Sequence, residues 1–183
     1  MNTAMVHVSP DGTGTPLWMC GALYEVRLQD EHSANRCSVF KVTSPPHILI
    51  APAHRHMVCD ELLIILKGTV VSFTGEEYTE HILRDGDFIW LPRGTLEGFK
   101  TTDESAEMLW VMMPGANSEL FFNLVAEPAL CRDVPPTTYV NPSLAVLRDF
   151  STRTGFQVVP GLRDDPEGDR IRRGTNAEQV AVG

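Results

Sequence analysis

The chain has 183 residues and a formal net charge of −9, with 43% hydrophobic and 21% charged residues. This size and composition predict one soluble globular domain with a core of its own. The excess of acidic side chains argues against nucleic acid and anionic membranes as partners, because both attract basic surfaces.

No apolar run reaches the roughly 18 residues that a membrane-spanning helix needs, and the first residues lack the pattern of a secretory signal. The four cysteines form no CxxC pair, which predicts reduced thiols in a cytoplasmic protein. Cys59 lies between candidate metal ligands, so it remains an alternative soft ligand.

Short apolar runs dominate the chain from Ala22 to Met113, and glycine- and proline-rich turns separate them. Many short strands at regular spacing predict an all-β barrel or sandwich. The predicted strands cover Ala22–Gln29, Ser38–Thr43, His47–Pro52, Glu61–Thr74 (two strands around Lys67 and Gly68), Glu76–Leu83, Asp87–Pro92 and Glu107–Pro114.

Two helices are predicted after the strands. Asn117 can cap a helix over 117–127. The second helix, over 141–155, is capped by Asn141 and ended by Gly155. The expected organisation is an N-terminal arm (1–15), a single β domain with C-terminal helices packed on it (16–162), and a flexible polar tail (163–183).

A cluster of metal-binding residue types lies in "PAHRHMVCDELLIILKG". His54 and His56 are two residues apart, so on an extended chain their imidazoles point to the same side. Glu61 opens the next strand, and after a turn its carboxylate can reach the same point. Gly68 then permits a tight turn.

The motif H-x-H-x4-E-x6-G formed by these residues resembles the first motif of the cupin superfamily. The second cupin motif, G-x5-P-x-G-x2-H, is matched by Gly86, Pro92 and Gly94, but Glu97 stands at the place of its histidine. The segments "PLWMCGALYEVRL", "PRGTLEGFK" and "FQVVPG" are similar to single-domain cupins of the quercetin-dioxygenase-like type.

The resemblance implies a double-stranded β-helix, or cupin jelly-roll barrel, that holds one divalent metal ion per chain. His54, His56 and Glu61 would bind this ion, and Glu97 would be the fourth ligand. The two imidazoles are neutral, so the two carboxylates alone would cancel the charge of the divalent ion. This makes the ion a weaker Lewis acid. The donor set favours Fe(II) or Mn(II), with Ni(II), Co(II) and Zn(II) as possible alternatives.

Other interpretations of these residues stay open. The histidines and Glu61 could form a satisfied polar cluster in a barrel without metal. Glu97 could instead form a surface salt bridge with Arg93 or Lys100. Apolar residues of the predicted strands would line a pocket for a flat, largely apolar ligand: Leu63, Ile65, Phe88, Trp90, Phe99, Met108, Trp110 and Met112.

The function expected from the resemblance is a metal-dependent dioxygenase of secondary metabolism, acting on a small aromatic, enol or polyketide-like substrate. Glu61 and Glu97 would be its catalytic carboxylates, with Glu61 able to shuttle a proton. The alternatives are a non-redox isomerase, cyclase or lyase that uses the Glu61/Glu97 pair, with or without metal, and a ligand-binding protein without turnover. Because cupins commonly pair through barrel edges and the N-terminal strand, a homodimer is also expected.

Overall fold

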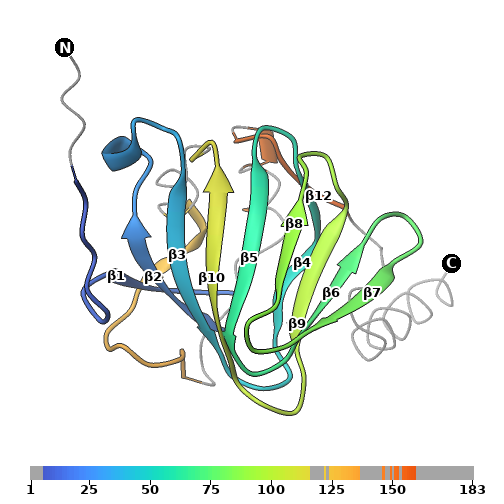
Figure 1. Cartoon of the computed structure of the whole chain (residues 1–183), viewed down its shortest axis with the longest axis horizontal. Coiled ribbons are helices and arrows are strands. Elements are labelled where there is room, and N and C mark those ends of the chain that lie inside the picture. Colours follow the sequence, from blue (N-terminus) through green and yellow to red (C-terminus); the bar gives the residue numbers. More distant parts are fainter. Residues whose placement is uncertain are drawn as a thin grey trace, which may run out of the picture.

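The strands of the chain form two antiparallel sheets (Figure 1). The computed structural model describes residues 6–115, 122, 124–136, 146, 149, 151–152 and 154–159. One sheet has seven strands in the order β11-β1-β2-β3-β10-β5-β8, and the other has five in the order β12-β4-β9-β6-β7. The strands are β1 (Thr15–Met19), β2 (Ala22–Leu28), β3 (Ser38–Ser44), β4 (Leu49–His56), β5 (Asp60–Lys67), β6 (Val70–Thr74), β7 (Thr79–Leu83), β8 (Phe88–Leu91), β9 (Glu97–Thr101), β10 (Ala106–Met113), β11 (Glu127–Pro128) and β12 (Phe156–Val158).

The prediction of an all-β fold is confirmed, but the prediction of a closed barrel is wrong. The chain changes sheet repeatedly, for example from β4 to β5 and from β8 to β9, and no ladder among the described strands joins one sheet to the other. The sheets instead bury their facing surfaces against each other. Buried and partly exposed residues alternate along β3, β5 and β10, as expected for strands with one face in the core.

Most predicted strands appear close to their expected bounds, including the division of Glu61–Thr74 at Gly68. Sequence patterns missed β1, which precedes the first predicted strand, β9, which carries Glu97, and the short strands β11 and β12. A short 3-10 helix, η1 (Glu31–Ser33), also joins β2 to β3. Among the residues described, no helix is long and apolar enough to cross a membrane.

Phe88 and Trp90 do not lie inside the molecule, so their prediction as pocket residues is corrected. They pair with Ile64 and Leu62 of β5 on the outer face of the large sheet, where their exposures are 66% and 47%. The alternate residues of β8 point inward, and Leu91 is buried opposite Glu61. This outer face is an apolar surface that a homodimer could cover, and the homodimer stays a prediction that sedimentation analysis can test.

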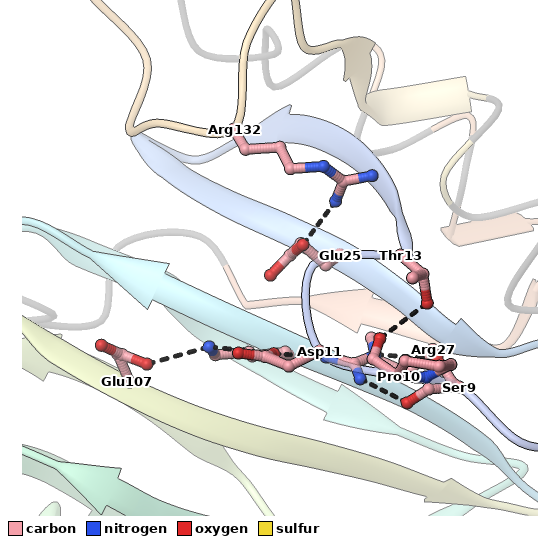
Figure 2. A network of polar contacts seen from close by, with 9 residues as sticks. Ser9, Pro10, Asp11, Thr13, Glu25, Arg27, Glu107 and Arg132 are labelled. Atoms are coloured by element: carbon pink, nitrogen blue, oxygen red, sulfur yellow. Dashed lines mark hydrogen bonds and ion pairs between the residues drawn. The ribbon is translucent and has the colours of Figure 1, made fainter.

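The N-terminal arm is bound to the large sheet by a polar network (Figure 2). The Arg27 guanidinium donates to Ser9 and forms an ion pair of 2.9 Å with Asp11. Lys41 of β3 lies 3.4 Å from Asp11 and 3.0 Å from Glu107 of β10. These contacts fix residues 9–11 against β2 and β3 before β1 begins.

After β10, the described segment 124–136 returns to the large sheet. Glu127 and Pro128 form β11 beside β1, so Glu127 does not end a helix as predicted. Arg132 forms an ion pair of 2.5 Å with the buried Glu25 of β2 (Figure 2). The predicted helices at 117–127 and 141–155 fall mostly outside the described residues, so their packing on the sheets is not confirmed. The predicted tail at 163–183 lies wholly outside them.

A Gly68→Ala substitution is expected to destabilise the protein much more than Gly75→Ala. Both glycines have positive φ, +85° and +70°, so both alanines carry the backbone strain of about 1–2 kcal/mol that an L-residue meets there. A Cβ at Gly68 would also lie 2.3 Å from the carbonyl oxygen of Ser105, whereas one at Gly75 meets nothing within 4 Å. Urea unfolding measures the free energy of unfolding of both variants. Equal decreases in the two variants would show that the neighbouring backbone moves to accommodate the Cβ at Gly68.

Candidate metal centre

The four predicted ligands converge between the two sheets. His54 and His56 lie on β4, Glu61 on β5 and Glu97 on β9. One ligand atom from each side chain lies within 4.8 Å of those of the other three, and all four residues are buried. The group is therefore assembled from two strands of the small sheet and one strand of the large sheet.

Strand pairing explains how these side chains meet. His54 is the direct neighbour of Glu97 across the β4–β9 ladder, so the two side chains share the inner face of the small sheet. Glu61 begins the inward-facing row of β5 that continues with Leu63 and Ile65, both 1% exposed. The crossing from β4 to β5 brings this row to face the histidines.

The histidine nitrogens are held in a defined arrangement. Nδ1 of His54 lies 2.7 Å from the carbonyl oxygen of Pro52. Because a carbonyl oxygen only accepts, Nδ1 carries the proton and Nε2 offers its lone pair to the centre. This Nε2 lies 3.0 Å from Nε2 of His56, which in turn lies 2.7 Å from Oε1 of Glu61.

Phe156 of β12 packs against both imidazoles. Its ring centroid lies 4.6 Å from that of His54 and 5.1 Å from that of His56. β12 pairs with β4, so Phe156 sits opposite His56. Sequence patterns did not identify this residue as part of the site, because no periodic signal links a three-residue strand to a partner about 100 positions away.

Burial changes the protonation of the group. Burial, and then the positive charge of His56, lower the pKa of His54 to about 3, so His54 is neutral at physiological pH, as a metal ligand must be. Burial, and then the negative charge of Glu61, raise the pKa of Glu97 well above its ordinary value. Both shifts describe the site without metal.

The donor set fits a divalent cation. Among the described residues, Oε2 of Glu97 is buried and has no hydrogen-bond partner, and its other oxygen, Oε1, lies 3.7 Å from Nε2 of His54. Buried carboxylates without partners are costly unless a cation or a proton balances them. Two imidazole nitrogens and two carboxylates supply such a cation with the nitrogen and oxygen donors that first-row divalent metals accept.

The competing interpretations of single residues are resolved by their contacts. Glu97 is 2% exposed, so a surface salt bridge with Arg93 or Lys100 is wrong, and Arg93 instead pairs with Asp60. Cys59 is buried but is not part of the ligand group. Burial, and then the negative charge of Glu61, raise the pKa of its thiol, which opposes the thiolate form that binds metals.

A small apolar cavity adjoins the centre. It has a volume of about 20 Å³, and His54 and Trp110 stand in its wall beside Met19, Tyr24, Ile50 and Phe156. A volume of this size holds about one water molecule. The other five predicted pocket residues that are buried on the inner faces are Leu63, Ile65, Phe99, Met108 and Met112, and their contact with a substrate stays a prediction.

Comparisons with known proteins support the fold assignment. Residues 40–112 match the family model of the cupin domain, a range that contains all four candidate ligands. No curated protein matches the chain in sequence. The quercetin-dioxygenase-like subtype is not confirmed by these comparisons and stays a prediction.

Several solved structures share the fold. A predicted oxalate decarboxylase from Thermotoga maritima is 21% identical over 58% of this chain and 98% of its own, with a TM-score of 0.53. The polyketide cyclase RemF from Streptomyces resistomycificus is 16% identical over 60% of this chain and 80% of its own, with a TM-score of 0.52. The nucleoside dehydratase Pac13 from Streptomyces is 14% identical over 63% and 88%, with a TM-score of 0.51. At these identities the likeness concerns the fold alone.

Proposed function

We propose, starting from the cupin domain that this chain contains, that the protein is a metal-dependent enzyme acting on a small, largely apolar molecule. The observation that carries the proposal is the buried group of His54, His56, Glu61 and Glu97, whose ligand atoms lie within 4.8 Å of one another. A bound divalent ion would polarise a substrate oxygen there. Fe(II) and Mn(II) are the preferred ions, because half of the donors are carboxylates.

The class of substrate follows from the surroundings of the centre. The neighbouring cavity is lined almost entirely by apolar and aromatic side chains, which favours an apolar or aromatic molecule with one or two oxygens directed at the metal. Because the cavity holds about one water molecule, a larger substrate requires rearrangement of the side chains around it.

The reaction class that we favour is proton transfer without net oxidation, as in a cyclase, lyase or isomerase. Two carboxylates face one centre, so Glu61 and Glu97 are placed to exchange protons with a substrate bound there. Proteins of similar fold include a polyketide cyclase and a nucleoside dehydratase. Ring closure and dehydration both proceed by proton transfers.

A dioxygenase is the second candidate, and one observation favours it. His54, His56 and Glu61 provide two imidazoles and one carboxylate at one point, which is the ligand set of many iron oxygenases. The quercetin-dioxygenase-like motifs point the same way. In this case Glu97 would be either a fourth ligand or a base beside the metal.

Turnover with and without oxygen separates these reactions. Protein loaded with Fe(II) or Mn(II) is incubated with polyketide-derived aromatics, nucleosides and flavonols, and products are identified by mass spectrometry. We expect product without oxygen, and a loss of about 10²–10⁴-fold in kcat in Glu61→Gln and Glu97→Gln. Glu77→Gln, which changes an exposed carboxylate, is the control.

Each other outcome supports a different function. Oxygen consumption that matches product formation would replace the favoured reaction class with the dioxygenase. Binding of a compound without any product would indicate a ligand-binding protein. The cytoplasm remains the proposed location because all four cysteines are free thiols, and cell fractionation tests it.

A further inference from the structure

The indole of Trp110 contacts the carboxylate of Glu61. Its Nε1–H donates a hydrogen bond of 2.7 Å to Oε2 of Glu61, and the two residues are 6% and 1% exposed. In the β5–β10 ladder Glu61 stands opposite Met112 and Trp110 opposite Leu63. Trp110 is therefore the diagonal neighbour of Glu61 on the inner face, a separation that a long aromatic side chain can bridge.

The two oxygens of Glu61 have different partners. Oε2 accepts the indole N–H, while Oε1 lies 2.7 Å from Nε2 of His56 and faces the ligand group. Each carboxylate keeps a buried oxygen without a hydrogen-bond partner among the described residues, Oε1 of Glu61 and Oε2 of Glu97, but no indole or other neutral donor is recorded at Glu97. Of the two carboxylates, only that of Glu61 has its orientation fixed by a neutral donor.

The ring of Trp110 is itself held in place. Its centroid lies 6.1 Å from that of Tyr24 and 6.2 Å from that of Phe99, distances at which aromatic rings pack favourably. Trp110 also forms part of the wall of the apolar cavity beside His54. A molecule in this cavity would touch the same indole that orients Glu61.

We propose that Trp110 is a positioning residue, which engages Oε2 of Glu61 so that Glu61 presents a single oxygen, Oε1, to a divalent metal. This inference rests on the proposed metal centre. A carboxylate that is held through one oxygen occupies one ligand position, which leaves more positions for water and substrate. A hydrogen-bond donor on the other oxygen also keeps the carboxylate oriented before the metal arrives.

The contact can be tested without metal by NMR of the three tryptophan indole N–H groups. Spectra of Trp18→Phe and Trp90→Phe assign the Trp110 signal by elimination. We expect this signal to move upfield in Glu61→Gln, because a neutral amide is a weaker acceptor than a carboxylate, and to stay in place in the exposed-site control Glu77→Gln. An unchanged Trp110 signal in Glu61→Gln would overturn the proposal.

The effect on metal binding is measured with Mn(II), using electron paramagnetic resonance to count the free ion. Trp110→Phe keeps an aromatic ring but removes the donor, and we expect its Mn(II) affinity to fall about 10–100-fold. Trp18→Phe is the matched control, because it removes an indole hydrogen bond of 2.8 Å to the Asp133 carbonyl, away from the centre. Its Mn(II) affinity should equal that of the wild-type chain.

The outcomes separate this inference from the proposed function. If the wild-type chain binds Mn(II) and Trp110→Phe binds it equally well, the role of Trp110 is wrong and the metal centre stands. If the wild-type chain binds none of the ions Mn(II), Fe(II), Ni(II), Co(II) or Zn(II), the metal centre and this role both fail. If urea unfolding shows that Trp110→Phe does not fold, the proposal is tested by the position of the Trp110 indole signal in Glu61→Gln.

Discussion

A double variant, His54→Ala and His56→Ala, is expected to bind no divalent metal under conditions in which the wild-type chain binds about one equivalent per chain. Both imidazoles lie within the group of ligand atoms, and two carboxylates alone hold a first-row metal weakly. Metal analysis of protein purified without chelator measures the content. Circular dichroism should show that the β structure of the variant is kept.

The control removes two histidines elsewhere. In His32→Ala, His47→Ala the lost imidazoles are exposed side chains outside the ligand group, so the metal content should not change. Retention of one equivalent by the His54/His56 variant would contradict the assignment. Glu97→His restores the histidine of the common cupin motif, and we expect it to raise the relative affinity for Zn(II), because imidazole suits zinc better than it suits manganese.

In the metal-free protein, Glu97→Gln is expected to increase the free energy of unfolding at neutral and alkaline pH but not in acid. The pKa of Glu97 is raised well above 4.5 by burial and then by Glu61. Above pH 4.5 the unfolded chain releases this proton while the folded chain keeps it, so stability falls as pH rises. Glutamine cannot ionise, so the variant does not lose this stability.

His54 gives the opposite slope on the acid side. Its folded pKa is about 3, against an ordinary value of 6.5, so between these values the unfolded chain binds the additional proton. Stability from His54 is therefore present above about pH 6.5 and is lost as pH falls toward 3. The wild-type chain and Glu97→Gln should both lose this stability as the pH falls, because both contain His54.

Urea unfolding in EDTA at a series of pH values tests this prediction. The difference between Glu97→Gln and wild type should grow from pH 4 to pH 8, while Glu77→Gln, at an exposed position, should show no such trend. A difference that is the same at every pH would mean that Glu97 does not titrate differently in the folded protein. In buffer without EDTA, added Mn(II) should stabilise the wild-type chain at pH 8, because binding favours the folded state.

Local patterns were sufficient for the ligands that lie close together in sequence. The spacing of His54 and His56 places both imidazoles on one side of any extended strand, and Glu61 lies near the start of the next strand, after a single short connection. The strand periodicity also placed Met108, Trp110 and Met112 on one face of β10, and all three are buried. These features depend on dihedral preferences and alternation, which the sequence expresses directly.

Pairing between distant strands decided the remaining features. Alternation groups Phe88 with Trp90, but only the register with β5 determines that their side faces outward. In the same way, the β4–β9 ladder places Glu97 beside His54, and the β4–β12 ladder places Phe156 against the imidazoles. The β5–β10 ladder places Trp110 within reach of Glu61. The sequence by itself determined which residue types could bind a metal and which of them share a strand face. The tertiary structure decided which faces meet, because register between segments far apart in the chain depends on the packing of both sheets at once.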